Sequence, residues 1–449
     1  MSLLDQSVLI DLAESLVAAA RRAGADAADA VAVRSISLSV EVRDDAVEES
    51  ERSEGDDVGL RVLVGRRQAV VSTNDTGHLD AKALAERAVA MARVAPEDRF
   101  AGLAEPDRLA REIPDLDMVD PELPSVTQLE GLARSAEAAA LAVAGVTRSG
   151  GASASSGVGG MVLATSHGFR GAYLASRHSL AMTAIAGEGT AMERDYDFTS
   201  ALHAADLDDP GAIGRKAATR AVERLHPRKV ETRRVPVVFD PRVASSLIGH
   251  LAGAINGSAV ARKTSFLQDR LGARLFRPGI RVIDDPLRRR GLRSRPFDGE
   301  GVAGRTLAVI EDGVLASWFL DSATARELGL STTGHAQRGV SSSPSPASTN
   351  LHLAAGTRTR EDLIRDIDDG FYVTDLIGMG ANLVTGDYSR GAAGFWIERG
   401  TLAYPVSEVT IAGHLAEMFA NLEPADDLAF RYGVNAPTVR VEGLTVAGR

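Results

Sequence analysis

The order of helical and strand-like segments most constrains the fold of this chain. Apolar residues recur at helical spacing over 5–24 and 79–95, while apolar and polar residues alternate over 29–50 and 58–75. The two kinds of segment come in blocks and do not alternate as they do in doubly wound α/β proteins. We therefore expect an α+β fold.

The same patterns divide the 449 residues into three regions. Residues 1–97 are expected to form a small N-terminal α+β domain. Residues 98–228 begin with a proline-rich, acidic connector and continue as a middle domain of mixed α/β character, with helices at 127–145 and 210–225. Residues 229–449 are expected to form a β-rich C-terminal domain with short helices.

Composition excludes several classes of function. Hydrophobic residues make up 44% of the chain, enough for a sizeable core, and the net charge of −11 disfavours direct binding of nucleic acid or an anionic membrane. The chain has no cysteine, which excludes disulfides, thiolate metal sites and thiol nucleophiles. Acidic residues interrupt the N-terminal helix, and no segment has the roughly 18 consecutive apolar residues of a membrane span. We expect a soluble, cytoplasmic protein without membrane contact.

One basic cluster departs from the acidic balance. We interpret it as a solvated surface, with contact to an anionic partner as the alternative. It consists of Arg288, Arg289, Arg290, Arg293 and Arg295.

The common catalytic motifs fail their spacing or context requirements. None of the nine histidines is followed by glutamate or lies four or five residues from another, so the helical zinc-protease motif is absent. The stretch GEGVAG (299–304) matches a dinucleotide-binding pattern, but a strand-like segment follows it where a helix is required. No G-x-S-x-G nucleophile elbow occurs. A metal site or a serine–histidine–aspartate triad assembled from distant residues stays open as an alternative.

The stretch SLIGHLAGAINGS (246–258) is the remaining candidate. The expected helix buries one apolar face, formed by Val243, Leu247, Leu251, Ala254 and Ile255. Another face carries Gly249, Gly253 and Gly257. Because glycine inside a helix costs about 1 kcal/mol relative to alanine, we expect another segment to pack very close to this face. His250 lies at the edge of the apolar face, either as a half-buried structural histidine or as a contact for substrate or partner.

Five stretches together resemble the TldD/PmbA family of metallopeptidases, also called TldD/TldE, and within it the PmbA/TldE-type subunit. They are SAVARKTSFL (258–267), RPFDGEG (295–301), STNLHL (348–353), VTGDYSRGAAGFWIERG (384–400) and YPVSEVTIAGHLAEMF (404–419). The resemblance covers most of the C-terminal half and extends more weakly to the N-terminal domain. It implies a two-subunit machine that cleaves unfolded peptides and matures peptide precursors. In that family the TldD-type subunit carries an H-E-x-x-x-H zinc helix and a further cysteine ligand.

The resemblance also implies that this chain lacks the zinc site. Aligned with the zinc helix, the first histidine falls at Gly249, the glutamate at His250 and the second histidine at Ala254. The cysteine region corresponds to FRYGVNAPTVRV (430–441), and the chain has no cysteine. We therefore expect no catalytic residue, no metal and no cofactor in this chain, with zinc in a partner subunit of the TldD type.

Six residues are candidates for a substrate groove or a subunit interface. Most of them lie in the segment 384–400, where glycines are interspersed with polar and aromatic side chains. A structural role in turns and core is the alternative for each. The six are Asn350, Asp387, Tyr388, Arg390, Trp396 and Glu408.

The leading interpretation is a PmbA/TldE-like subunit that forms a heterodimer with a TldD-type metallopeptidase and helps to shape the chamber for a peptide substrate. A homodimer is plausible when the chain is isolated. Two alternatives stay open. One is an autonomous metallopeptidase with an unrecognised site, and the other is a non-enzymatic peptide-binding protein or modulator of DNA gyrase.

Overall fold

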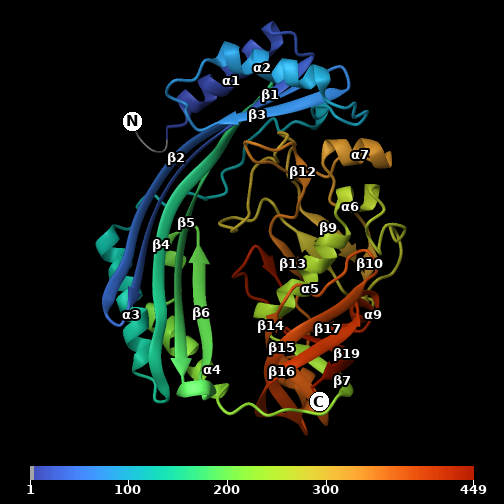
Figure 1. The fold of residues 1–449 in the computed structure, drawn as a ribbon. Helices are drawn as coiled ribbons and strands as arrows, with labels where there is room; N and C mark the ends of the chain where they lie inside the picture. Colours follow the sequence, from blue (N-terminus) through green and yellow to red (C-terminus); the bar gives the residue numbers. More distant parts are fainter. Residues whose placement is uncertain (1–4, 449) are drawn as a thin grey trace.

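One six-stranded sheet runs through the N-terminal half of the molecule. The computed structural model describes residues 5–448. The strand order is β3-β2-β1-β4-β5-β6, and every neighbouring pair is antiparallel. At ~3.3 Å per residue, the 20 residues of β4 extend over about 65 Å, and Figure 1 shows the sheet as a tall, curved wall. The strands are β1 (Ala27–Arg43), β2 (Ala46–Val64), β3 (Arg67–Thr73), β4 (Val146–Thr165), β5 (Arg170–Ala186) and β6 (Glu193–Ala201).

Four helices cover one face of this sheet. One pair, α1 (Ser7–Arg22) and α2 (Ala81–Val94), packs over one end, and the other pair, α3 (Val126–Leu141) and α4 (Pro210–Glu223), packs over the opposite end (Figure 1). Residues Ala30 and Val40 of β1 belong to the apolar clusters formed with these pairs. Val31 lies on the other face of β1, against the C-terminal region. Short 3-10 turns lie at Pro106–Arg108, Gly189–Ala191 and Ala204–Asp206.

The regions expected at residues 1–97 and 98–228 share this sheet. Strands β1 to β3 come from the first region and β4 to β6 from the second. β1 pairs with β4 from Asp29 opposite Thr165 to Val42 opposite Ala152. The segment between α2 and α3 is largely without regular structure. The sequence pattern did not indicate that strands of the two regions pair in one sheet.

The C-terminal region contains two further multi-stranded sheets. The larger has the order β16-β15-β14-β7-β19-β17, and an additional pairing between β16 and β19 closes it on itself. The smaller has the order β10-β9-β8-β13-β18, and β11 pairs with β12 separately. The strands are β7 (Arg233–Phe239), β8 (Val282–Asp284), β9 (Leu307–Glu311), β10 (Val314–Leu315), β11 (Ala336–Gln337), β12 (Ser345–Pro346), β13 (Leu351–Leu353), β14 (Asp369–Ile377), β15 (Asp387–Glu398), β16 (Thr401–His414), β17 (Leu422–Pro424), β18 (Val434–Asn435) and β19 (Val439–Ala447).

Apart from α5, the helices of the C-terminal region are short. The helices are α5 (Pro241–Ala254), α6 (Gly257–Ala261), α7 (Ser322–Leu328), α8 (Arg360–Arg365) and α9 (Leu415–Ala420). The α+β class and the β-rich character of this region are therefore confirmed. Among residues 5–448, the structure contains no helix with the length and apolar character needed to cross a membrane.

A buried ion cluster joins the long sheet to the C-terminal region. Asp29 and Arg61 lie directly opposite each other on β1 and β2, and Nη2 of Arg61 donates to the Asp29 carboxylate at 2.5 Å. Arg338, from the segment after β11, donates to the same carboxylate. Close by, a Cβ added at Gly59 would lie 1.7 Å from the carbonyl oxygen of Val340. The backbone of the C-terminal region therefore passes directly against β2.

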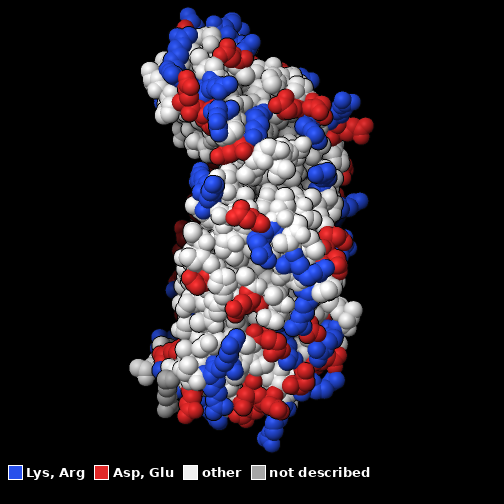
Figure 2. Space-filling view, turned by 90° about the vertical axis from the view of Figure 1, so that its right-hand side faces the viewer, with Lys and Arg blue, Asp and Glu red and all other residues white. Residues whose placement is uncertain are grey.

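Two of the five arginines of the basic cluster at residues 288–295 pair with acids. Nη2 of Arg289 and Nε of Arg290 lie 3.0 and 2.6 Å from the Asp117 carboxylate, and Arg290 also pairs with Asp206 at 2.9 Å. On the face drawn in Figure 2, basic and acidic side chains are intermixed. Arg295 departs from the expected solvated surface, because its Nε and Nη2 atoms are buried.

Candidate functional site

Helix α5 is the helix that the resemblance aligns with a zinc helix. It follows β7 and is capped by Asp240, whose carboxylate accepts a hydrogen bond from a backbone N–H of the first turn at 3.1 Å. All residues of the expected apolar face are buried in the main core. The helix ends at Ala254, however, and Asn256 caps the separate helix α6. The single helix expected over 246–258 is therefore wrong, and Gly257 belongs to α6.

The two glycines of α5 differ in their surroundings. A Cβ added at Gly249 would meet no atom within 4 Å, whereas one added at Gly253 would lie 2.7 Å from the Leu383 side chain. Close packing thus accounts for Gly253 and not for Gly249. Ala254 is fully buried in the core. At the two positions aligned with zinc-binding histidines, Gly249 therefore has no side chain and Ala254 has only a buried methyl group. Neither residue offers a metal ligand.

His250, Tyr388 and Arg390 come together beside α5. Tyr388 and Arg390 are two residues apart on β15, so their side chains point to the same face of the strand. The ring centroids of His250 and Tyr388 lie 6.0 Å apart. Within residues 5–448, Nε2 of His250, the hydroxyl of Tyr388 and Nε of Arg390 are buried and have no hydrogen-bond partner. Three of the residues singled out in the sequence thus form one cluster.

The environment keeps the two rings of this cluster uncharged. Burial, together with the charge of Arg390, lowers the pKa of His250 to about 4. Burial raises the pKa of Tyr388 to about 12. Across residues 5–448, no three His, Cys, Asp or Glu side chains form a group suited to a metal ion. With Gly249 and Ala254 at the two aligned ligand positions, the residues present beside α5 do not fit a zinc ion.

Acid should destabilise the protein through His250. The folded-state pKa of about 4 lies below the ordinary value of 6.5, so the neutral ring stabilises the fold above pH 6.5 and this contribution is lost as the pH falls towards 4. Because the ring is only half-buried, we expect the free energy of unfolding to fall by about 1 kcal/mol between pH 7.5 and pH 5 through this group. Urea unfolding at pH 7.5 and pH 5 should therefore show a smaller loss for His250→Gln than for the wild type. Equal losses in the two proteins would contradict this role.

The other four candidates lie apart from this cluster. Asp387 is exposed at the start of β15. Trp396 is 3% exposed and belongs to the core. Glu408 is exposed at an irregularity of β16, and its hydrogen bond with Lys229 lowers the pKa of its carboxyl group. Asn350 is buried in a separate polar network. The structure therefore does not bring the six residues into one groove.

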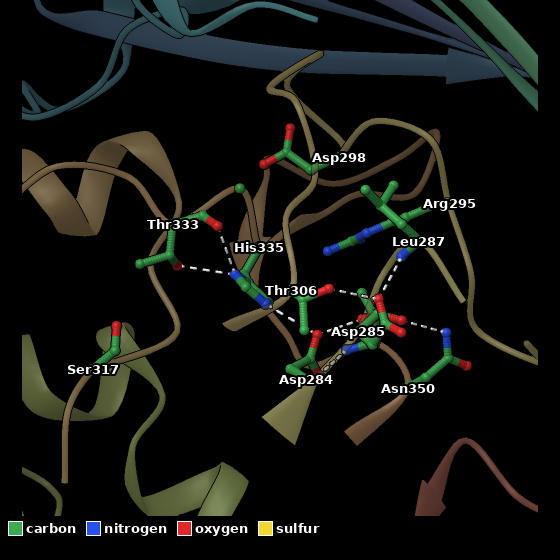
Figure 3. A network of polar contacts seen from close by, with 12 residues as sticks. Asp284, Asp285, Leu287, Arg295, Asp298, Thr306, Ser317, Thr333, His335 and Asn350 are labelled. Atoms are coloured by element: carbon green, nitrogen blue, oxygen red, sulfur yellow. Dashed lines mark hydrogen bonds and ion pairs between the residues drawn. The ribbon is translucent and has the colours of Figure 1, made fainter. Parts of the chain in front are cut away.

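The side chain of Asn350 holds the segment 285–294 in place through hydrogen bonds. Its Nδ2 donates to the carbonyl oxygen of Asp285 and to the Ser294 hydroxyl, both at 2.8 Å. Its Oδ1 accepts from the backbone N–H of Arg293 at 2.9 Å. Figure 3 shows Asn350 beside Asp285 in this network. These contacts tie the start of β13 to the segment 285–294.

A buried Asp–His pair lies in the same network (Figure 3). Nε2 of His335 lies 3.1 Å from the Asp284 carboxylate, and Nδ1 of His335 lies 2.9 Å from the carbonyl oxygen of Thr333. Asp284 also accepts from the backbone N–H of Thr349 at 2.7 Å and from the Thr349 hydroxyl. Both side chains of the pair are 0% exposed. The pair therefore contributes to the structure and does not face a substrate.

A cavity of about 480 Å³ opens between this network and the long sheet. Val33, Met161 and Tyr173 line its sheet side, and Arg295 and Arg338 line its C-terminal side. The sequence interpretation missed this cavity, because its residues come from distant segments. The sequence did single out part of its lining, because Arg295 and Gly299 lie in the stretch 295–301 and Ser348 and Thr349 in the stretch 348–353.

Two acids occupy the loop that passes this cavity. The Asp298 carboxylate accepts hydrogen bonds from the backbone N–H groups of Glu300, Val302 and Ala336 at 2.8 to 3.0 Å. Burial, with the nearby charge of Asp298, raises the pKa of Glu300 to about 8. The loop leads into β9 and not into a helix, in line with the rejection of dinucleotide binding at 299–304.

The comparisons with known proteins point to one family over most of the chain. Sequence profiles match for PmbA/TldA metallopeptidase domain 1 at residues 28–92, the central domain at 119–225 and the C-terminal domain at 232–448. The metalloprotease PmbA of Escherichia coli O157:H7 is 37% identical over 426 residues, which cover 94% of this chain and 93% of that protein.

Solved structures show the same fold. A candidate modulator of DNA gyrase from Bacteroides thetaiotaomicron has a TM-score of 0.90 at 27% identity, with 99% of each chain covered. TldE from Thermococcus kodakarensis has a TM-score of 0.83 at 19% identity, with 97% of this chain and 99% of that chain covered, which shows a likeness of fold alone. Fold and sequence thus agree on the PmbA/TldA metallopeptidase family of proteins. The chain belongs to the TldD/PmbA family, and its high-coverage relatives are named metalloprotease PmbA.

Proposed function

We propose that this chain is the PmbA/TldE-type subunit of a cytoplasmic zinc metallopeptidase and that it pairs with a TldD-type subunit that holds the zinc. The observation that carries the proposal is the composition of α5 at the aligned positions. Gly249 and Ala254 replace the two histidine ligands, and His250 replaces the glutamate. The names of the PmbA relatives and the fold likeness to TldE support the same reading.

In this proposal the partner supplies the chemistry of peptide cleavage. A zinc ion held by that partner would supply polarisation of the scissile carbonyl group and activation of a water molecule. His250 of this chain is a poor general base at neutral pH, because burial lowers its pKa to about 4. The contribution of this chain is therefore to bind the partner and to shape the chamber that holds an unfolded peptide or a peptide precursor.

The zinc content of the complex tests this division of roles. The variant His250→Ala should leave about one zinc per heterodimer, as in the wild type, because His250 is not a ligand. The isolated chain should carry less than about 0.1 zinc. Elemental analysis of purified samples measures both values, and a partner subunit that lacks one zinc-binding histidine is the control for zinc loss. Loss of zinc in the His250→Ala complex, or stoichiometric zinc in the isolated chain, would reject the proposal in favour of an autonomous metal site.

A further inference from the structure

Three arginines meet at the loop 288–293 without an acidic partner. Within residues 5–448, Arg177 of β5 and Arg288 and Arg293 of the basic cluster form no ion pair. Nη2 of Arg177 donates to the carbonyl oxygen of Leu292 at 2.9 Å, and burial together with the charge of Arg293 lowers the pKa of Arg177. Because like charges at close range are unfavourable, an anion bound among them would stabilise this arrangement.

The guanidinium group of Arg288 is held in place and is open to solvent. Its Cζ atom lies 3.4 Å from the centroid of the Phe430 ring, which is 39% exposed. Within the described chain its nitrogens form no hydrogen bond, and none of them is enclosed. The N–H edges of Arg288 are therefore available to an oxyanion, which a guanidinium group binds through two parallel hydrogen bonds.

Arg288 and Phe430 line a cavity of about 180 Å³. The cavity lies between the end of β6 and the segments 288–292 and 430–435, and the half-buried ring of Tyr432 forms another part of its wall. Its volume is below the roughly 300 to 1,000 Å³ of sites for drug-sized ligands, so it suits a single amino-acid residue. A positive group and two aromatic rings thus face the same small space.

Most acids around this cavity are already engaged. They lie on the connector or on the segment after β6, and their carboxylates hold other arginines or backbone N–H groups. The contacts are Asp117 with Arg289 and Arg290, Asp206 with Arg290, Asp208 with Arg431, and Asp120 with the backbone of Glu122 and Ala204.

Asp284 and Asp285 are the remaining acids beside Arg288. The Asp284 carboxylate is buried and accepts from the backbone N–H of Thr349 at 2.7 Å. The Asp285 carboxylate accepts from the Thr306 hydroxyl at 3.0 Å. Neither forms an ion pair with Arg288 within the described residues. An anion from outside would therefore reach Arg288 without displacing a counter-ion of the protein.

We propose that this cavity binds a carboxylate group of a peptide on Arg288, with the apolar part of the same residue against Phe430 and Tyr432. The proposal joins the open guanidinium edge to the adjacent aromatic wall, which together match a carboxylate carried on a short carbon chain. It rests on the proposed function, which makes peptides the relevant ligands. The carboxylate is either the C-terminus or an acidic side chain.

Calorimetric titration of the full isolated chain with three short peptides tests the inference. The first is acetyl-Ala-Leu-Leu with a free C-terminal carboxylate, the second is its C-terminal amide, and the third is acetyl-Ala-Glu-Leu amide. At least one carboxylate peptide should bind about tenfold more tightly than the uncharged amide. Preference for the first identifies the C-terminus, and preference for the third identifies an acidic side chain. Equal affinity for all three peptides, or no binding of either carboxylate peptide, would overturn the inference.

Inorganic phosphate is the control for the class of anion. It carries charge but has no apolar part to lie against Phe430 and Tyr432, so it should bind more weakly than the favoured peptide. Phosphate that binds as tightly as that peptide would show a general anion site and overturn the assignment to a peptide.

The variant Arg288→Met should remove the preference for a carboxylate. Its side chain forms no hydrogen bond or ion pair within the described chain, so thermal unfolding should match the wild type. The favoured peptide should bind about tenfold more weakly to the variant, with the uncharged amide unaffected. Arg87→Met, on the exposed side of α2, changes the net charge equally and should bind as the wild type does. Unchanged binding of the favoured peptide by Arg288→Met, or equal weakening in both variants, would overturn the inference.

Peptide cleavage by the reconstituted pair separates this inference from the proposed function. If the pair needs this chain for cleavage but the chain does not discriminate carboxylate peptides, the inference fails and the proposed function stands. If the chain binds the carboxylate peptide through Arg288 but adds nothing to cleavage, the carboxylate site stands and the proposed function fails.

Discussion

Replacing Asp29 with alanine should lower the free energy of unfolding by about 3 to 5 kcal/mol. Its carboxylate is the shared counter-ion of Arg61 and Arg338, whose side chains are 4% and 0% exposed. Although burial opposes ionisation, the two arginines hold the pKa of Asp29 below its usual value. In the alanine variant both arginines lose the one ion pair that each of them forms within the described residues. Urea denaturation at neutral pH measures the loss.

The variant Asp56→Ala is the matched control. Asp56 pairs with Arg34 across the same two strands, but the side chains are 29% and 23% exposed. Water screens such a pair, so we expect a loss of about 1 kcal/mol or less. Similar losses in the Asp29 and Asp56 variants would contradict the view that the buried ion cluster holds the long sheet against the C-terminal region.

The variant Asp284→Ala should also be strongly destabilised, by about 3 kcal/mol or more. The Asp284 carboxylate accepts from the backbone and hydroxyl of Thr349 and contacts Nε2 of His335. All these groups are buried, so removing the carboxylate leaves several polar atoms without partners. Thermal or urea unfolding, compared with the wild type, gives the size of the effect.

Its neighbour in the sequence provides the control. Asp285 is only half-buried, and its carboxylate accepts from the Thr306 hydroxyl at 3.0 Å and from the backbone N–H of Leu287 at 3.2 Å. The variant Asp285→Ala should lose about 1 kcal/mol. A loss for Asp284→Ala no greater than that for Asp285→Ala would show that the Asp–His pair is not a structural anchor.

Elements with local signals could be predicted from the sequence. The helical segment at 79–95 contains α2, and the Asp80 carboxylate caps it by accepting from the Lys82 and Ala83 backbone N–H groups. The break after Ala254 was missed, because apolar periodicity continues through it while Asn256 starts a new helix. A cap signal inside a periodic segment is ambiguous until the packing is known.

Contacts between distant segments could not be predicted. Asp29 and Arg61 are recognisable as a pair only when the register of β1 and β2 is known, and Arg338 lies 309 residues beyond Asp29. The chemistry of 384–400 did indicate Tyr388 and Arg390, which the fold places beside His250. The cavity beside the long sheet could not itself be predicted, because the sheet residues that line it lie far in the sequence from the stretches 295–301 and 348–353.

Cleavage of an unfolded peptide by reconstituted subunits is the most direct test of the proposed role. The assay compares this chain alone, a TldD-type partner alone and the mixture, with the zinc content of each sample measured in parallel. The proposal predicts that this chain alone is inert and that the mixture cleaves about tenfold faster than the partner alone. Cleavage by this chain alone with bound metal would make it an enzyme in its own right. A mixture no faster than the partner alone would contradict the accessory-subunit role.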